Sequence, residues 1–319
     1  MEKKIDIISI GEVLIDFIGH QTDANIAGTS SYQRFLGGSP TNVAANASKM
    51  GLETFLVASC GADGLGNYIE QEIKERGLST DGLKKWSSLP TSIILVSKST
   101  GTPDFIPYRY ADCEIREEQI SEDRLSSAKI FHTTCFALSR NPARDTILKN
   151  AIKAKELGVK TSIDLNYSEK IWPNKTEAIK VIEEYLSTNP LLKLSEDDCY
   201  RLFGEMKSDE AIFNYFHQLG VSTVCLTKGE KGVVVSDTEK GVFSKKAHRV
   251  AEVKDTTGAG DAFWTGFLYA YLKGFTLDKG IELAQKLAVI KLQNMGGGLP
   301  NDFDKDLFLD SLVRDMIKF

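Results

Sequence analysis

The sequence is poor in cysteine and proline and contains no long hydrophobic run. Its 319 residues include only 5 cysteines and 8 prolines. The cysteines are scattered and form no Cys-x-x-Cys pair, which excludes a disulfide framework, argues against a zinc site and fits a reducing compartment. No stretch approaches the roughly 18 apolar residues of a membrane span, and the N-terminus lacks the apolar region and cleavage site of a signal peptide. We therefore expect a cytoplasmic protein with no membrane partner.

The chain also lacks an excess of positive charge. Its 39 Lys and Arg residues stand against 44 Asp and Glu, a formal net charge of −5. A nucleic-acid partner is therefore not expected, because such proteins carry a broad basic surface. Hydrophobic residues make up 42% and charged residues 26%, as in ordinary globular proteins. An acidic protein that holds a polyphosphate needs local devices, such as backbone amides, helix ends and metal ions.

Short β-rich segments alternate with helical ones for most of the length. Residues 54–58, Thr-Phe-Leu-Val-Ala, are almost all apolar, as expected for a strand covered on both faces. The helical patterns at 67–76 and 144–157 end at Gly77 and Gly158. The alternation predicts an α/β fold with a mostly parallel central sheet and helices on both faces, in three layers. The expected strands are 5–10, 54–60, 92–97, 130–134, 160–164, 191–194, 223–227 and 232–236.

Two stretches, 13–35 and 91–115, break this alternation. Both contain alternating residues and polar turns with little helical character, and residues 99–104 read as a hairpin turn. They predict either a small β-sheet beside the main sheet or two surface loops, and the pattern alone does not choose between them.

A Gly-rich loop followed by an apolar helix spans 255–271, with the sequence Asp-Thr-Thr-Gly-Ala-Gly-Asp-Ala-Phe-Trp-Thr-Gly-Phe-Leu-Tyr-Ala-Tyr. Gly266 and Ala270 permit close packing of this helix. Its unpaired N-terminal amides and positive dipole end favour an anion such as phosphate. A carboxylate at that position, Asp261, repels phosphate unless it has a chemical task, and in phosphoryl transfer an Asp accepts the proton of the attacking hydroxyl. An ordinary helix N-cap is the alternative, which the seven-residue context disfavours.

A second motif spans 37–47, with the sequence Gly-Gly-Ser-Pro-Thr-Asn-Val-Ala-Ala-Asn-Ala. Ser39 is expected to cap a helix, and Pro40 suits the first helical position. Asn42 lies in the first turn, where its amide can donate to and accept from a polyol, and Asn46 lies one turn further on the same face. The alternative interpretation is a capped core helix with two polar positions.

Together these motifs resemble the two signature patterns of the ribokinase-like (PfkB) family of carbohydrate kinases. Three further segments resemble the family in the family's order: Gly-Glu-Val-Leu-Ile-Asp at 11–16, Gly-Ala-Asp-Gly-Leu-Gly at 61–66 and Leu-Thr-Lys-Gly-Glu-Lys-Gly at 226–232. The likeness runs from residue 5 to about 300. It implies one ribokinase-like domain over 1–319, with a Rossmann-like three-layer architecture.

The resemblance implies site residues position by position. Asp261 is expected to be the catalytic base, and the amides of residues 258–260 (Gly258, Ala259 and Gly260) are expected to form the anion hole for charge on the γ-phosphate. Arg109, in a Pro-Tyr-Arg-Tyr-Ala-Asp segment similar to fructokinase-like members, is expected to contact the sugar or to pair with a surface acid. The full set expected to bind the sugar is Asp16, Gly38, Asn42 and Arg109.

The nucleotide side of the site is implied by the 226–232 segment. Thr227, Gly229 and Gly232 match the family's nucleotide-binding strand and loop, for which a simple β-turn is the alternative. The resemblance implies ATP and Mg²⁺ as cofactors.

Two metal sites are also implied. The family's Asn-x-x-Glu element appears here as Ser-Glu-Asp-Asp at 195–198. Asp198 is shorter than Glu, so it is expected to hold Mg²⁺ through water, and the alternative is a helix cap with solvated acids. Asp255 and the triple-Gly turn at 296–298 match regions that hold a monovalent cation, such as K⁺, in many relatives.

The segments 13–35 and 91–115 look like the lid that covers the sugar in this family and often joins two subunits. A lid is chemically sensible, because a bound water would otherwise accept the phosphoryl group. The resemblance therefore implies a homodimer formed through the lid.

One departure bears on the substrate. Residues 164–172 read Asp-Leu-Asn-Tyr-Ser-Glu-Lys-Ile-Trp, with Ser168 where the family often has Arg. The absence of this arginine weakens the case for a sugar acid as the substrate, and Lys170 compensates for the missing arginine only as a point charge. We expect an ATP-dependent kinase acting on a primary hydroxyl, with fructose first and 2-keto-3-deoxygluconate or ribose as alternatives. A non-catalytic sugar- or nucleotide-binding regulator is a different class, and a dinucleotide oxidoreductase lacks a G-x-G-x-x-G fingerprint.

Overall fold

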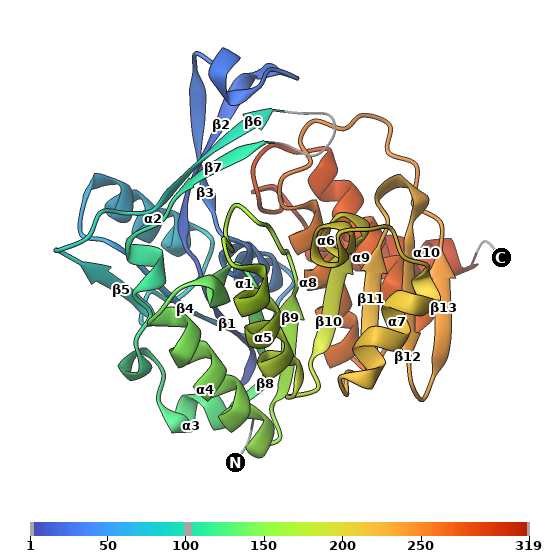
Figure 1. The fold of residues 1–319 in the computed structure, drawn as a ribbon. Helices are drawn as coiled ribbons and strands as arrows, with labels where there is room; N and C mark the ends of the chain where they lie inside the picture. Colours follow the sequence, from blue (N-terminus) through green and yellow to red (C-terminus); the bar gives the residue numbers. More distant parts are fainter. Residues whose placement is uncertain (1–2, 99–103, 318–319) are drawn as a thin grey trace.

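The computed structural model describes residues 3–98 and 104–317. Within them, a central nine-stranded sheet runs in the order β13-β12-β11-β10-β9-β8-β1-β4-β5 (Figure 1). Along this order every neighbouring pair from β11 to β5 is parallel, whereas β12 is antiparallel to both β11 and β13. The strands are β1 (Ile5–Ile10), β4 (Thr54–Gly61), β5 (Leu83–Trp86), β8 (Ala128–Thr134), β9 (Lys160–Asp164), β10 (Leu191–Ser195), β11 (Thr223–Thr227), β12 (Val233–Asp237) and β13 (Gly241–Lys245).

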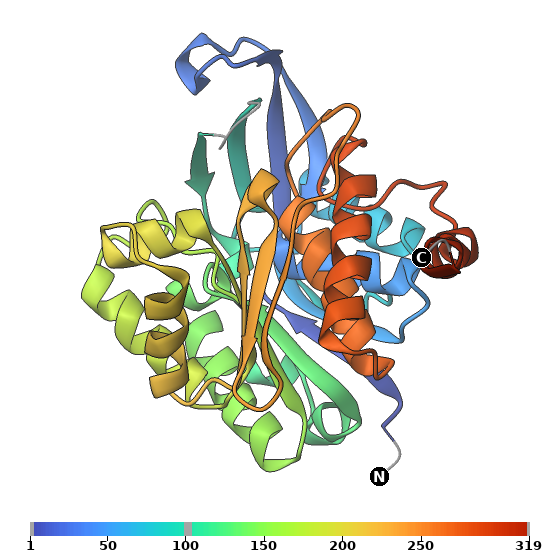
Figure 2. The same ribbon diagram turned by 90° about the vertical axis from the view of Figure 1, so that its right-hand side faces the viewer.

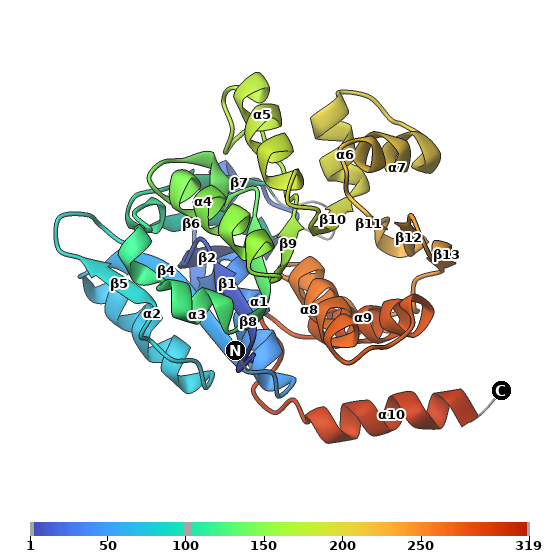
Figure 3. The ribbon, with the colours of Figure 1, turned by 90° about the horizontal axis from the view of Figure 1, so that it is seen from below.

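Helices cover both faces of this sheet, which confirms the predicted α/β architecture (Figure 3). One face is packed by α3 (Glu122–Ser126), α4 (Ala143–Glu156), α5 (Lys175–Leu186), α6 (Glu196–Phe203) and α7 (Asp209–Gln218). The other is packed by α1 (Ser39–Lys49), α2 (Gly64–Glu75), α8 (Ala259–Leu272) and α9 (Leu277–Leu292), with α10 (Lys305–Ile317) lying outside them.

Strand β1 shows why consecutive apolar residues are needed. Ile8 and Ile10 belong to the buried cluster that contains α4 side chains, whereas Ile7 belongs to the cluster formed with α8 and α9. Successive strand residues point to opposite faces of a sheet. A strand between two helical layers is therefore buried at consecutive positions, as β1 is from Ile7 to Ile10.

Helix α8 packs closely on α9. A Cβ on Gly266 would lie 2.7 Å from Cα of Ala284, and one on Gly280 would lie 3.2 Å from Cβ of Ala270. The small residues thus let the two helix backbones approach, as the sequence predicted. Helix α8 is buried from Asp261 to Ala270, whereas residues 258–260, just before Asp261, are partly exposed at the edge of the core.

A separate four-stranded sheet has the order β3-β2-β6-β7 and rises beside the main sheet (Figure 2). Its strands fall within or next to the two stretches that broke the alternation, and the segment expected as a strand at 92–97 belongs here rather than to the main sheet. The predicted hairpin turn at 99–104 lies outside the described residues except for Asp104. The strands are β2 (Leu14–Thr22), β3 (Tyr32–Gly37), β6 (Ile93–Lys98) and β7 (Phe105–Tyr108).

The sequence reading matched β1, β9 and β11 residue for residue and missed β5, β13 and α10. Both missed strands lie at sheet edges, and none of their residues is buried. Edge strands are weakly patterned, because only one neighbour and part of one face constrain them. No helix among the described residues has both the length and the apolarity needed to cross a bilayer.

Candidate active site

The N-termini of α1 and α8 meet at one point, where they surround the carboxylate of Asp261. The Ser39 hydroxyl donates to Oδ1 of Asp261 at 2.6 Å, and the Asn42 amide Nδ2 donates to Oδ2 at 2.8 Å. Both donors come from the first turn of α1. The two sequence motifs, more than 200 residues apart, therefore form one site.

The position of Asp261 differs from that of an N-cap. The cap residue of α8 is Gly258, so Asp261 lies in the first turn of the helix. Burial raises the pKa of its carboxyl, while the bonds from Ser39 and Asn42 and the charges of Lys193 and Lys291 act in the opposite direction. A carboxylate has about four acceptor positions, so two donors leave room for a substrate hydroxyl.

The start of α8 provides backbone amides next to that carboxylate. Gly258 has φ +75°, and a Cβ there would lie 2.1 Å from the carbonyl oxygen of Gly297. Only glycine fits this left-handed position against a neighbouring backbone. The Ala259 amide bonds the carbonyl of Thr256 at 3.2 Å, so the expected anion hole rests chiefly on the amides of Gly258 and Gly260.

Asp16 lies on β2, close to Asp261. It is buried, and its pKa is raised to about 7, first by burial and then by the negative charges of Asp261 and Asp255. A Cβ on Gly37, in the adjacent strand β3, would lie 2.2 Å from its Oδ2. Asp16 therefore lies within electrostatic reach of both Asp261 and Asp255.

The start of α1 differs from the expected geometry. The N-cap is Gly38, at φ +104°, and no side chain caps the helix, so the expectation that Ser39 caps it is wrong. The Ser39 hydroxyl is engaged by Asp261 instead. A Cβ on Gly38 would lie 2.2 Å from the carbonyl oxygen of Glu12, and the Asn42 Oδ1 is buried without a hydrogen-bond partner.

Sequence reasoning missed the buried carboxyl of Glu12. Its Oε1 accepts from the Ser39 amide at 3.1 Å, and its Oε2 accepts from the Thr134 hydroxyl at 3.0 Å. Burial raises its pKa to about 8. Glu12 thus links the residue that binds Asp261 to the end of β8.

Sequence reasoning also missed Lys193, in the middle of β10. Its ammonium bonds Oδ2 of Asp164 at 2.5 Å, and the pair is almost fully buried. The two residues are direct neighbours in the parallel strands β10 and β9. A Cβ on Gly260 would lie 3.1 Å from the Lys193 Nζ, so a positive charge stands beside the α8 N-terminus. The available signal was a lysine inside an apolar strand, since lysine is rarely buried unless paired.

Asp198 lies in the first turn of α6, next to this pair. Its Oδ2 accepts from the amide and hydroxyl of Ser195, at 2.8 and 2.6 Å, in a capping box. The carboxyl is buried, and burial together with the charge of Asp164 raises its pKa. The acidic run is therefore a helix cap, as one interpretation held, but Asp198 is not solvated.

The proposed nucleotide segment forms the end of β11 and the turn into β12. Thr227 ends β11, Gly229 begins a short 3-10 helix at φ +55°, and Gly232 ends it at φ +107°. A Cβ on Gly232 would lie 2.0 Å from the carbonyl of Lys245 in β13. Gly232 therefore has a packing reason of its own, whereas Gly229 is exposed.

Arg109 is buried rather than exposed. Its Nε and Nη2 donate to Oδ2 of Asp112 at 2.9 and 2.6 Å, and Nη1 donates to the Phe136 carbonyl at 3.0 Å and to the Ser139 hydroxyl. The guanidinium also lies over the Phe136 ring. Its acidic partner is therefore internal, and its role in sugar binding stays a prediction.

Lys170 does not take the place of the missing arginine at Ser168. Its ammonium pairs with Asp104 and bonds the Phe105 carbonyl at 3.0 Å, at the exposed start of β7. Lys170 therefore connects the small sheet to the loop after β9, and its charge is not the one that we expected for a sugar acid.

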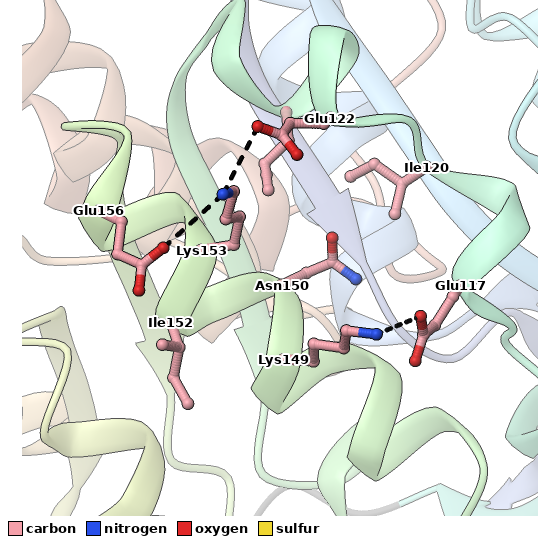
Figure 4. A pocket seen from close by; sticks show the side chains of 9 residues that line it. Glu117, Ile120, Glu122, Lys149, Asn150, Ile152, Lys153 and Glu156 are labelled. Carbon is pink, nitrogen blue, oxygen red and sulfur yellow. Dashed lines mark hydrogen bonds and ion pairs between the residues drawn. The ribbon is translucent and has the colours of Figure 1, made fainter.

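A surface hollow of about 420 Å³ lies between α4 and the chain around α3 and shares no residue with the site described above. Figure 4 shows that its lysines are paired with acids, Lys149 with Glu117 and Lys153 with Glu122 and Glu156. The paired charges leave this hollow without a cation for phosphate.

No group of three or more His, Cys, Asp or Glu side chains in residues 3–98 and 104–317 is arranged to hold a metal ion. Mg²⁺ that arrives with a nucleotide keeps several waters and takes one or two carboxylates. Asp198 and the unpartnered Oδ1 of Asp164 suit that smaller requirement.

The fold and the site together define a class. The fold is a mostly parallel sheet covered by helices on both faces, with a small sheet beside it. The site is a buried aspartate next to a helix that starts with Gly-Ala-Gly. Together they are the architecture of a carbohydrate kinase that transfers phosphate from ATP. The family model described as "pfkB family carbohydrate kinase" matches residues 4–304, and the chain belongs to this family.

Individual relatives support this assignment. The chain is 34% identical over 296 residues to an ATP-dependent 6-phosphofructokinase of Thermoanaerobacterium thermosaccharolyticum, covering 92% of this chain and 90% of that protein. The structure of Halothermothrix orenii fructokinase matches with 38% identity and a TM-score of 0.78, over 88% and 98% of the two chains. An uncharacterized sugar kinase from Pyrococcus horikoshii in complex with ATP matches with 29% identity and a TM-score of 0.82, over 97% and 99%.

Proposed function

We propose that this sugar kinase transfers the γ-phosphate of ATP to a primary hydroxyl of fructose, with Asp261 as the base. The observation that carries the proposal is the buried Asp261 carboxylate, held by two donors beside the N-terminus of α8. Burial raises the pKa of this carboxyl, and a carboxylate with a raised pKa is a stronger proton acceptor. The similarity to a fructokinase structure at 38% identity supports the choice of sugar.

In the proposed reaction Asp261 takes up the proton that the sugar hydroxyl loses. The sugar hydroxyl donates to Asp261, whose carboxylate takes the proton as the oxygen attacks phosphorus in line, and the bond from the γ-phosphorus to ADP breaks. Negative charge on the transferred group is stabilised by the amides of Gly258 and Gly260 at the α8 N-terminus. Lys193 stands beside them and supplies a positive charge that sequence reasoning had not foreseen.

Mg²⁺ neutralises phosphate charge when it is bound with ATP. Asp198 would hold it through water, with the free Oδ1 of Asp164 as a second acceptor. Thr227, Gly229 and Gly232 are proposed to bind the nucleotide from the β11–β12 turn. Of these three residues Gly229 is the exposed one, and a ligand can approach the backbone there.

The sugar is proposed to lie between the small sheet and α1. Asp16 and Asn42 would bind its hydroxyls, and Gly38 would let it approach the backbone. The unpartnered Oδ1 of Asn42 supports this, because a buried acceptor without a donor is costly. Arg109 would act through the Asp112 network at the edge of the small sheet.

The test pairs Asp261→Asn with the wild type, and measures ADP formation separately from sugar binding by calorimetry. We expect turnover to fall by roughly 10²- to 10⁴-fold while fructose still binds. Near-normal turnover would remove Asp261 from the role of base. A wild type that binds a sugar but forms no ADP with any of them would instead be a binding regulator.

A second candidate substrate is fructose 6-phosphate, because the relative that is 34% identical is an ATP-dependent 6-phosphofructokinase. The sugar panel therefore contains fructose, fructose 6-phosphate, ribose and 2-keto-3-deoxygluconate. We expect the highest kcat/KM for fructose, since the two cations that the sequence offered for an acidic substrate, Arg109 and Lys170, are already paired with acids. A higher kcat/KM for the phosphorylated sugar would assign this chain to the second reaction.

We further propose that residues 1–319 act as one domain, with 13–35 and 91–115 as a lid that also joins two copies. Ile106, Tyr108 and Tyr110 on or next to β7 are exposed. Large apolar side chains gathered on one strand are typical of an interaction surface.

A further inference from the structure

A lysine ammonium is buried beneath the site at the end of α9. Lys291 has none of its surface exposed. Its Nζ donates to the main-chain carbonyl of Asp255 at 3.1 Å and to that of Asn294 at 2.8 Å. Neither partner is a carboxylate, although the negative charges of Asp255 and Asp261 act on it. Sequence reasoning gave this residue no role.

Burying an ammonium costs several kcal/mol unless carbonyls and nearby charges compensate. A hydrophobic residue would fill the same space at the end of an apolar helix without that cost. The positive charge of Lys291 therefore has a function here, and the residues that its ammonium contacts indicate what that function is.

Lys291 joins the two backbone segments that frame the start of α8. The first segment contains Asp255, whose Oδ1 accepts the Thr257 amide at 2.9 Å and whose Oδ2 accepts the Gly296 amide at 2.8 Å. The second is the turn after α9, whose Gly297 carbonyl would lie 2.1 Å from a Cβ on Gly258. The Lys291 ammonium holds the two segments together through its hydrogen bonds to the carbonyls of Asp255 and Asn294.

The same observations test the K⁺ site implied by the family resemblance. A potassium ion in a protein is held by several main-chain carbonyls that replace its water. Here the carbonyls of Asp255 and Asn294 are bound by Lys291, and both Asp255 carboxylate oxygens accept backbone amides. The residues present therefore do not fit K⁺ at Asp255.

We propose that Lys291 is a positioning residue that supplies, from within the chain, the positive charge that a monovalent cation would otherwise bring. The ammonium orders the 255–258 loop against the 294–298 turn and so sets the amides of Gly258 and Gly260. Phosphoryl transfer by this chain then needs no added K⁺. The inference rests on the proposed role of the α8 N-terminus as an anion hole.

The first experiment uses the wild-type chain without substrate. Its Tm is measured in KCl, NaCl and choline chloride at equal ionic strength. We expect one Tm in all three salts, because the carbonyls are already bound. A Tm that KCl raises above that in choline chloride would show a specific potassium site and overturn the inference.

The second experiment compares turnover in the same salts for the wild type and two variants. Lys291→Met removes the charge and keeps the volume, whereas Lys291→Ala removes the charge and leaves space for an ion. We expect both to lose turnover by roughly 10²-fold, because the amides shift. Added K⁺ or NH₄⁺ is expected to restore turnover in Lys291→Ala only. The matched control is Lys279→Met, since Lys279 is exposed on the same helix.

Wild-type turnover that depends on K⁺, or a Lys291→Met variant with unchanged turnover and Tm, would overturn the proposal, as would a Lys291→Ala variant that no cation rescues. If the alanine variant does not fold, the wild-type salt comparison decides alone. Should the wild type phosphorylate no sugar, the proposed function fails, while the Tm comparison still tests Lys291.

Discussion

The hydroxyl of Ser39 donates a 2.6 Å hydrogen bond to Oδ1 of Asp261, although 222 residues separate them in sequence. The amide of Ser39 is in turn held by Glu12, and Glu12 is held by Thr134 at the end of β8. Four chain segments thus fix the orientation of one carboxylate. A proton acceptor in phosphoryl transfer depends on such fixed geometry.

Replacing Ser39 by alanine is expected to shift the acid limb of the kcat/KM profile to higher pH. The hydroxyl stabilises the ionised form of Asp261, so its loss raises the pKa of the base. A charge-assisted bond of this kind corresponds to about one pH unit. The other charged groups near Asp261, among them Asp16, Lys193 and Lys291, are unchanged in the variant.

Ser39→Thr keeps a hydroxyl and is the control, with a profile close to that of the wild type. An acid limb that stays in place in Ser39→Ala, with only kcat reduced, would mean that Ser39 orients Asp261 without influencing its ionisation.

Replacing Asp16 by asparagine is expected to stabilise the fold at alkaline pH. The pKa of Asp16 is raised to about 7 in the fold, against an ordinary value of 3.8. A carboxyl with a raised pKa favours the folded state below its ordinary pKa, and that contribution is lost as the pH rises through about 7. Tm should therefore fall between pH 5 and pH 8 more steeply in the wild type than in Asp16→Asn.

Calorimetry with fructose gives the second readout for Asp16→Asn. Loss of an acceptor for sugar hydroxyls should weaken binding, so the variant gains stability and loses affinity. Parallel Tm curves for the two proteins would show that Asp16 is ionised at neutral pH and would contradict the prediction.

Breaking the buried Lys193–Asp164 pair is expected to destabilise the protein. Lys193→Met leaves the Asp164 carboxylate buried without its partner, a loss of about 3–5 kcal/mol in the free energy of unfolding. The double variant Lys193→Met/Asp164→Asn removes both charges and should recover most of that stability in urea unfolding.

Turnover separates the structural role of Lys193 from a catalytic one. If Lys193 stabilises charge on the transferred phosphate, the stable double variant is slower than Asp164→Asn alone, which accounts for the proposed part of Asp164 in holding Mg²⁺. A double variant with wild-type turnover would limit Lys193 to a structural role.

Charge on the exposed side of β7 is expected to prevent association of two copies. Ile106→Asp with Tyr108→Asp places two carboxylates where apolar side chains are now exposed. Sedimentation should show a dimer for the wild type and a monomer for the variant. Val242→Asp, at an exposed position of β13, is the control and should remain dimeric. A wild-type monomer at micromolar concentration would contradict the proposed lid interface.

Local pattern alone predicted much of the architecture. Consecutive apolar residues in β1 and β4 indicate burial on both faces of the sheet, and the small residues of α8 indicate close packing against another helix. The Gly-Ala-Gly-Asp segment was placed at a helix start because glycine and helix ends have strong local signatures. These features depend on neighbours within a few residues, so the sequence contains them directly.

Only the tertiary structure decided how the polar side chains pair. Ser39 was expected to cap its own helix and instead binds Asp261, and Arg109 found an internal acid. Lys193 and Lys291 were not foreseen at all, since a buried lysine depends on carbonyls and carboxylates brought by distant strands and turns. A polar group bonds whichever partner the fold brings within reach, and that choice is made by chain topology rather than by the residues beside it.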